Sequence, residues 1–257
     1  MPRKHDNKRI PTRGWDPVAN WYDGWMGELG SHHHQRLAIP AALDLLALER
    51  GEQVLDLGCG NGALAAHAAR LGARYTGIDI SPRLIAIAQA RHGAHGRFVR
   101  GDVRQLERLR ELEQGRYDAA VFLLSIQDMN PLSRVIEAAA WALHPGSRLV
   151  IVMTHPCFRV PRQSGWGHDP QRDLRFRRVD TYLQPLTVPM KPYGRHQPGT
   201  TISFHRPLGA YVSALSEAGL LLDALHELTS FQEGASAAER RAQAQIPLFA
   251  ALRARRL

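Results

Sequence analysis

Three glycines alternate with other residues in the stretch Gly58–Gly62. The apolar residues before it, Val54 to Leu57, predict a buried strand, and the amphipathic residues after it, Ala63 to Leu71, predict a helix. Glycine permits positive φ and lets a ligand approach the backbone, and the first turn of a helix offers free N–H groups to an anion. The stretch therefore predicts a tight turn that binds a small, partly anionic cofactor.

Acidic side chains stand within or next to three successive predicted strands. They are Asp56, Asp79 and Asp102. The carboxyl ends of parallel strands meet at one edge of a sheet, so the three acids are expected to converge on one crevice beside the glycine turn. A carboxylate in that crevice can accept two neighbouring hydroxyl groups at once, which suits the ribose of a nucleoside.

The nine residues from Val54 to Gly62 read VLDLGCGNG, and they resemble the first motif of the class I methyltransferases that use S-adenosylmethionine. The resemblance extends in the order of elements from about Trp15 to the C-terminus. Residues 58–63 also satisfy the dinucleotide pattern G-x-G-x-x-G/A, so a nucleotide-dependent oxidoreductase is a distant alternative. Two features favour the sulfonium cofactor: Asp56 occupies a strand position that is normally apolar in dinucleotide folds, and a Gly-Asp pair ends at Asp102.

The resemblance implies where the cofactor is held. Asp79 is expected to accept the ribose hydroxyls, Asp102 to receive the adenine amino group, and Val103 to donate its backbone N–H to the ring. A segment of the form A-x-x-Y-D covers the cofactor in related enzymes, and here it contains Tyr22. The residues expected to bind S-adenosylmethionine are Tyr22, Asp56, Gly58, Cys59, Gly60, Asp79, Ile80, Asp102, Val103 and Leu124.

Polar residues follow the fourth predicted strand, Tyr117 to Leu124, where methyl acceptors meet the sulfonium in the family. Gln127 and Asp128 are candidates to orient or deprotonate an acceptor, and a polar strand end without a function would have the same composition. The N/D-P-P-Y/F box of nucleic-acid amino-methylating enzymes is absent, which counts against methylation of base amines. A small-molecule acceptor is therefore favoured, with RNA or protein as the alternative.

A long insertion, residues 155–206, follows the fifth predicted strand, where a short link is usual. Alternating segments and scattered prolines predict a small strand-rich cap, and insertions at this point in the family roof the acceptor pocket. Its arginines have planar forks that suit a carboxylate or a phosphate. A lone histidine is more often a structural group than a catalytic one. The expected catalytic residues are His155, Asp128 and His205, and the expected acceptor-binding residues are Gln127, Arg159, Arg162 and Trp166.

The net charge of +9 is concentrated in two places. Residues 1–13 carry five basic side chains against one acidic, and residues 155–206 carry nine against three. Such concentrations indicate an anionic partner, for example an anionic small molecule or, less favoured, a nucleic acid. An arginine-rich surface that reflects codon usage is the other interpretation, because only three of the 33 basic residues are lysine.

The composition indicates a cytoplasmic protein without a membrane segment. The 257 residues include only two cysteines, which give no disulfide framework, and they contain no run of 18 apolar residues and no secretory h-region. The adjacent histidines at 32–34 lack the i, i+4 spacing of a helical metal site, so no metal is expected.

The order of predicted elements indicates an α/β fold. We expect a doubly wound, mostly parallel sheet of seven strands in the order 3-2-1-4-5-7-6, with the last strand antiparallel. Residues 1–14 are expected to form a basic, disordered tail, and residues 15–257 a single methyltransferase domain with a helical lid at 15–50 and the cap at about 155–206. The expected reaction is in-line displacement of a methyl group by an oxygen, nitrogen or carbon nucleophile.

Overall fold

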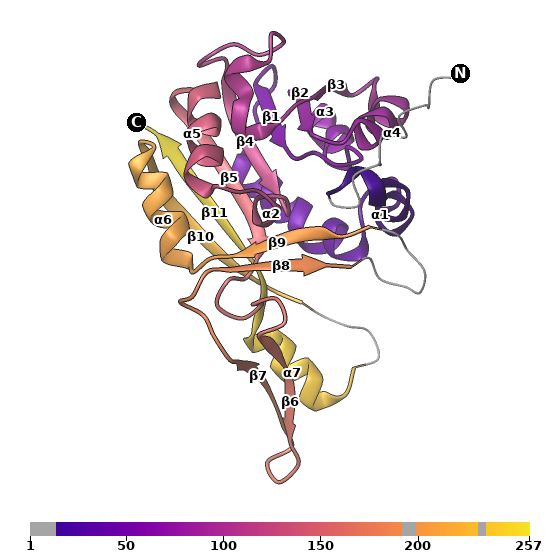
Figure 1. The fold of residues 1–257 in the computed structure, drawn as a ribbon, viewed down its shortest axis with the longest axis vertical. Helices are drawn as coiled ribbons and strands as arrows, with labels where there is room; N and C mark the ends of the chain where they lie inside the picture. Colours follow the sequence, from indigo (N-terminus) through magenta and orange to yellow (C-terminus); the bar gives the residue numbers. More distant parts are fainter. Residues whose placement is uncertain (1–13, 192–198, 231–234) are drawn as a thin grey trace, which may run out of the picture.

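The computed structural model describes residues 14–191, 199–230 and 235–257, so the predicted basic tail lies outside the described residues except for Gly14. Its centre is a seven-stranded sheet (Figure 1). In spatial order the strands are β10 (Leu220–Thr229), β11 (Pro247–Arg256), β5 (Leu143–Thr154), β4 (Tyr117–Leu123), β1 (Gln53–Leu57), β2 (Arg74–Asp79) and β3 (Gly96–Arg100).

Strands β1 to β5 run parallel to one another, and β11 lies antiparallel between β5 and β10. Numbered along the chain, the order is 3-2-1-4-5-7-6, so the predicted fold class is confirmed. Parallel neighbours bring the carboxyl ends of β1, β2 and β4 to one edge, and the loops that follow these strands can build a common site there.

Helices cover both faces of the sheet (Figure 1). One face packs against α2 (Ile39–Leu46), α3 (Ala65–Arg70) and α4 (Pro82–His92), and the other against α5 (Leu132–Ala142) and α6 (Leu208–Glu217). Leu55 and Leu57 of β1 pack toward α5, whereas Val54 packs toward α2. These three side chains are fully buried, and burial of each contributes about 1.5–3 kcal/mol.

The start of α4 illustrates how the sequence sets a helix boundary. Ser81 accepts the backbone N–H of Leu84 at 3.2 Å, and Pro82 occupies the first helical position, where no N–H is needed. The helix therefore begins directly after β2 and leaves the end of that strand open toward the site.

The N-terminal segment and the cap complete the described chain. The former contains η1 (Asp16–Val18), α1 (Ala19–Met26) and η2 (His34–Ala38), and short helices η3 (Val103–Arg108) and η4 (Ile126–Asp128) follow β3 and β4. The cap consists of two hairpins, β6 (Ser164–Asp169) with β7 (Leu174–Val179), and β8 (Leu186–Met190) with β9 (Thr201–His205). In Figure 1, β8 and β9 cross toward α1, and β6 and β7 extend from the body beside α7 (Ala237–Gln245).

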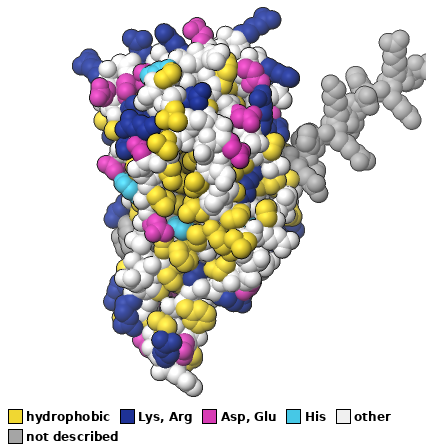
Figure 2. Space-filling model, turned by 90° about the vertical axis from the view of Figure 1, so that its left-hand side faces the viewer, with side chains coloured by type: hydrophobic (Ala, Val, Ile, Leu, Met, Phe, Trp, Pro, Cys, Tyr) yellow, Lys and Arg dark blue, Asp and Glu magenta, His cyan; other side chains and the backbone are white. Residues whose placement is uncertain are grey.

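Edge strand β10 has a partly apolar outer surface. Leu221 and Leu225 of this strand are 60% and 43% exposed, and Val212 of α6 is 38% exposed. Figure 2, which views the molecule from the side of α6 and β10, shows apolar side chains gathered on this face.

No helix among the described residues has the length and apolar character needed to cross a membrane.

Candidate active site

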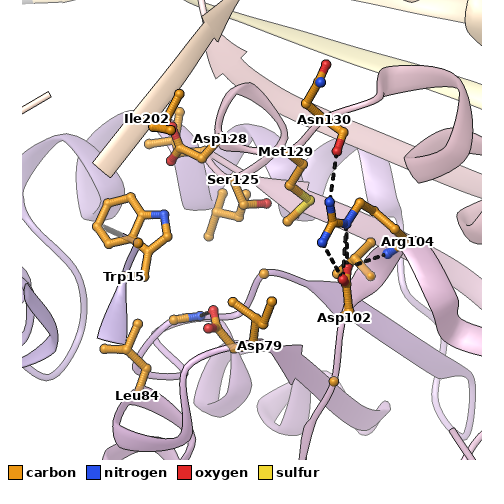
Figure 3. A pocket seen from close by; sticks show the side chains of 18 of the residues that line it. Trp15, Asp79, Leu84, Asp102, Arg104, Ser125, Asp128, Met129, Asn130 and Ile202 are labelled. Carbon is orange, nitrogen blue, oxygen red and sulfur yellow. Dashed lines mark hydrogen bonds and ion pairs between the residues drawn. The ribbon is translucent and has the colours of Figure 1, made fainter. Parts of the chain in front are cut away.

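A cavity of about 430 Å³ opens at the carboxyl ends of β1, β2, β3 and β4. Its wall is formed by the loops after these strands, the N-terminal segment and β9 (Figure 3). In Figure 3, Trp15 and Leu84 lie on one side of the space, and Asp102, Arg104 and Asn130 lie on the other. Eight of the ten residues expected to bind the cofactor line it: Tyr22, Gly58, Gly60, Asp79, Ile80, Asp102, Val103 and Leu124.

The glycine turn forms the floor of this cavity. Gly58 has φ of +79°, and a Cβ atom at this position would lie 2.7 Å from both the Cβ of Ser125 and the Cε of Met129. Gly60 has φ of +56°, and a Cβ atom there would lie 3.0 Å from the hydroxyl of Tyr22. Both positions therefore require glycine, because the backbone is left-handed and neighbouring side chains approach closely.

Asp79, at the end of β2, binds the turn directly. Its Oδ2 accepts the backbone N–H of Gly60 at 3.0 Å, and its Oδ1 accepts the backbone N–H of Ser81 at 2.9 Å. Burial raises the pKa of Asp79, and these backbone hydrogen bonds act in the opposite direction. Each carboxylate oxygen has a further lone pair, so the group can still accept hydroxyls from a ligand in the cavity.

Asp102 lies across the cavity from Leu84 and is held by Arg104 (Figure 3). The Nη2 of Arg104 lies 2.5 Å from Oδ2 of Asp102, and the backbone N–H of Arg104 donates to Oδ1 at 3.0 Å. Arg104 also donates to the carbonyl of Asn130 at 3.2 Å. The guanidinium of Arg104 lowers the pKa of Asp102, so this carboxylate is ionised and fixed in orientation.

Asp56 and Cys59 do not line this cavity. The Oδ2 of Asp56 accepts the hydroxyl of Tyr75 at 2.6 Å behind the turn, and burial raises the pKa of Asp56 to about 7. Its Oδ1 has no hydrogen-bond partner among the described residues, and it borders a small neighbouring cavity together with Cys59. The predicted convergence of three acids therefore holds for Asp79 and Asp102 only, because Asp56 precedes the strand end and its side chain points into the helix layer.

The N-terminal segment is tied to the glycine turn. Asn61 donates to Oδ1 of Asp23 at 3.0 Å, and Asp23 also pairs with Arg91 of α4, whose Nη2 lies 2.7 Å from its Oδ2. These contacts hold α1 over the sheet edge and place Trp15 and Tyr22 in the cavity wall.

A second cavity, of about 480 Å³, lies between the N-terminal segment and the cap. It shares Trp15, Tyr22 and Asp128 with the first cavity, so these three residues form the boundary between the two spaces. Its wall combines aromatic rings with cationic groups and includes Trp21, Trp25, Gln127, Thr154, Arg159, Arg162, Arg177 and Lys191.

Asp128 is the acidic residue at the boundary. Burial raises the pKa of its carboxyl group to about 8, and no described residue forms a hydrogen bond or an ion pair with that group. The neighbouring Gln127 donates its amide to the carbonyl of Leu124 at 2.6 Å, and its Oε1 is buried without a partner among the described residues. A ligand in the second cavity could therefore bond to either side chain.

The structure does not bring His155 or His205 to either cavity. The Nε2 of His155 lies 2.8 Å from Oε1 of Glu227, and its Nδ1 accepts the backbone N–H of Cys157 at 3.2 Å. The Nε2 of His205 lies 2.7 Å from the carbonyl of Tyr182. Both side chains are buried and neither lines a cavity that could hold the acceptor, so the structure does not bring these histidines to the expected catalytic position.

Of the residues expected to bind the acceptor, Gln127, Arg159 and Arg162 line the second cavity, and Trp166 does not. Trp166 instead lies against two arginines of the cavity wall, with the Cζ of Arg159 5.4 Å and the Cζ of Arg177 5.6 Å from its ring centroid. Some residues that line the two cavities are absent from the residues expected to bind the cofactor or the acceptor. The main ones are Trp15, Trp21, Trp25, Arg104 and Arg177. Trp15, Trp21 and Trp25 stand close to Tyr22 in the sequence, and this concentration of aromatic residues is the signal that could have identified three of them.

No group of three or more His, Cys, Asp or Glu side chains that could hold a metal ion exists within the described ranges.

Comparison with known proteins shows that residues 54–146 match the family described as "Methyltransferase domain". The chain is 29% identical over 156 residues to a ubiquinone biosynthesis O-methyltransferase of Xylella fastidiosa (strain M23), which covers 59% of this chain and 63% of that protein. It is 35% identical over 121 residues to a demethylmenaquinone methyltransferase of Tropheryma whipplei (strain Twist), which covers 45% and 48%.

The chain thus matches between 48% and 63% of the length of these curated relatives. A solved structure described as an S-adenosylmethionine dependent methyltransferase from Mesorhizobium loti superposes with a TM-score of 0.67 at 26% identity, covering 84% of this chain and 96% of that one. These matches confirm the resemblance to S-adenosylmethionine-dependent methyltransferases that residues 54–62 predict.

Proposed function

We propose that this chain, a class I S-adenosylmethionine-dependent methyltransferase by its family, transfers a methyl group to a small-molecule acceptor bound in the second cavity. The observation that carries the proposal is the pair of adjoining cavities with Asp128, Tyr22 and Trp15 at their boundary. The names of the curated relatives, which refer to ubiquinone biosynthesis and demethylmenaquinone, support a small acceptor with an aromatic body.

The first cavity has the features that an adenosine needs. Gly58 and Gly60 leave its floor free of side chains, and Asp79 offers two carboxylate oxygens at its edge. Asp102 and Val103 stand on the opposite wall, where an adenine amino group and ring nitrogen would be bound. When bound, S-adenosylmethionine supplies a methyl group on a positively charged sulfur, which leaves as a neutral thioether without needing an acid.

The aromatic residues at the boundary would position the acceptor and exclude water. Trp15 and Tyr22 face both cavities, and their rings pack edge to face with centroids 5.1 Å apart. Burial raises the pKa of Tyr22 well above its ordinary value, so its hydroxyl stays protonated and can donate a hydrogen bond. In this role residues 15–50 act as the lid over the cofactor.

Asp128 is the residue placed to accept a proton from the acceptor. A carboxylate in the boundary wall can take the proton of a hydroxyl or an acidic C–H group as the new bond to the methyl forms, and a pKa of about 8 suits a base near neutral pH.

A cytoplasmic location is part of the same proposal, supported by the two free thiols Cys59 and Cys157, which fit a reducing compartment.

The decisive experiment is transfer of labelled methyl from S-adenosylmethionine into a cell extract that is then fractionated by size. Label in the small-molecule fraction supports the proposal, and label only in RNA or protein contradicts it. Calorimetry with S-adenosylmethionine and with a nicotinamide dinucleotide separates a methyltransferase from an oxidoreductase, because only the expected cofactor should bind.

A further inference from the structure

We propose that Arg159 and Arg177 form an anion-binding subsite in the second cavity, and that the methyl acceptor carries a carboxylate or phosphate group bound there. The identification of this anion as part of the acceptor rests on the proposed function. The subsite itself is argued from the contacts of the two guanidinium groups, the charge of the cavity wall and the burial of its residues.

Both arginines are held in place by neutral groups. Arg177 donates to the carbonyl of Phe158 at 2.8 Å and to the hydroxyl of Ser164 at 2.9 Å, and Arg159 donates to the carbonyl of Pro247 at 3.3 Å. Their guanidinium groups lie against the same ring, that of Trp166. Within the described part of the chain neither has a carboxylate partner, so both retain N–H donors for a ligand.

Two other arginines of β7 differ from Arg177 because each has a carboxylate partner. The Nη2 of Arg175 lies 2.5 Å from Oε1 of Glu239, and the Nε of Arg178 lies 2.9 Å from Oδ1 of Asp180. Arg177 stands between them in sequence, lines the cavity and has no such partner in the described ranges. The strand therefore neutralises two of its three arginines internally and leaves the positive charge of the third facing the cavity.

The electrostatics of the cavity favour an anionic ligand. Burial and the nearby charge of Arg177 lower the pKa of Arg159 to about 10, and burial also lowers the pKa of Arg177. Two positive charges that lie close together and are partly removed from water destabilise each other. An anion bound between them would offset both their repulsion and the cost of their burial. The described wall adds the cations Arg162 and Lys191, and Asp128 is its only acidic side chain.

The aromatic wall indicates the rest of the ligand. The rings of Trp21 and Trp25 stack at 6.1 Å between centroids with an interplanar angle of 5°, and both rings line the cavity. A planar or apolar body between this wall and the cap would have its anionic end at Arg159 and Arg177 and its nucleophile near Asp128. The planar guanidinium fork makes bidentate contacts with carboxylates and with phosphates, so the two anions share this chemistry.

The test measures binding of simple probes without turnover. Benzoate, phenyl phosphate and the neutral benzamide are titrated by calorimetry against the wild type, Arg159→Gln, Arg177→Gln and Arg177→Lys. Arg178→Gln is the matched control, because it removes an exposed arginine of the same strand. S-adenosylhomocysteine binding and thermal unfolding of every variant verify that the fold and the first cavity are intact.

We expect benzoate or phenyl phosphate to bind more tightly than benzamide, and the tighter of the two identifies the anion. Each glutamine variant should weaken that probe about tenfold to a hundredfold, Arg177→Lys should weaken it less, and Arg178→Gln should leave it unchanged. Equal binding of all three probes, or equal losses in Arg177→Gln and Arg178→Gln, would overturn the subsite. Failure of methyl transfer with the probe results intact would instead contradict the proposed function alone.

Discussion

The carboxylate of Asp79 accepts the backbone N–H of Gly60 at 3.0 Å, so the end of β2 and the glycine turn after β1 are held together as one unit. The same carboxylate accepts the N–H of Ser81 at the start of α4. These two contacts fix the edge of the first cavity before any ligand enters, which reduces the ordering cost of binding.

Asp79→Ala is expected to weaken S-adenosylmethionine binding by about 1–3 kcal/mol, because the ligand hydroxyls lose a charged acceptor. Calorimetry measures the affinity directly. Asp180→Ala, which removes an exposed carboxylate of the cap, serves as the control and should bind the cofactor as the wild type does. An Asp79→Ala protein that is folded and has unchanged affinity would contradict the ribose assignment.

The sequence predicts the strand order and the glycine turn but not the direction of each acid. Apolar runs and turn residues mark the strands of the sheet, and the order 3-2-1-4-5-7-6 follows from the family resemblance. In β1, however, residues 54–57 are all buried, as is usual for a parallel strand covered on both faces. Such a strand has no alternation to interpret, so the direction of Asp56 into the helix layer is visible only in the structure.

The cap was less predictable because its contacts join distant segments. Thr154 lines the second cavity, and the next residue, His155, points to the other side and meets Glu227 of β10, 72 positions away in sequence. Nothing in the spacing indicates that pair. Arg177 was visible only as one of several arginines, since its lack of a partner depends on where Glu239 and Asp180 lie.

His155→Gln is expected to lower stability and to leave turnover unchanged. Both ring nitrogens are bonded in the buried side chain, and loss of one such bond costs about 1–3 kcal/mol. Thermal unfolding and a steady-state assay on the same preparation separate the two effects. A large fall in kcat with normal stability would restore His155 as a catalytic candidate.

Gly58→Ala is expected to destabilise the fold and to reduce cofactor binding. The new Cβ would lie 2.7 Å from Ser125 and Met129 in a backbone with φ of +79°, and such a combination costs about 1–3 kcal/mol or more. Gly24→Ala is the control, since a Cβ there meets nothing within 4 Å and Gly24 lies inside α1. That variant should be about 0.5–1 kcal/mol more stable than the wild type, and equal behaviour of the two variants would refute the steric argument.

Asp128→Asn is expected to lower the rate of methyl transfer and to raise the stability of the fold at pH 8. The pKa of Asp128 is raised from 3.8 to about 8, so the folded state binds a proton that the unfolded state releases, and stability falls as the pH rises from about 4 to about 8. The uncharged amide of asparagine does not titrate, so the variant does not show this fall in stability. Because the carboxyl group lies in a cavity wall and is partly accessible to water, we expect a gain of about 1–3 kcal/mol at pH 8 that vanishes near pH 4.

In the same variant, turnover of a hydroxyl or C–H acceptor should fall about 10²–10⁴-fold, because the proton has no base to accept it. The wild-type rate should rise with pH up to about 8 as Asp128 ionises, and the variant should lose that dependence. Asp44→Asn is the control, since the carboxylate of Asp44 is 73% exposed and lies outside both cavities. A variant at position 128 with the wild-type rate and the wild-type pH profile would exclude Asp128 as the base, and the cavity boundary would then act through orientation of the acceptor alone.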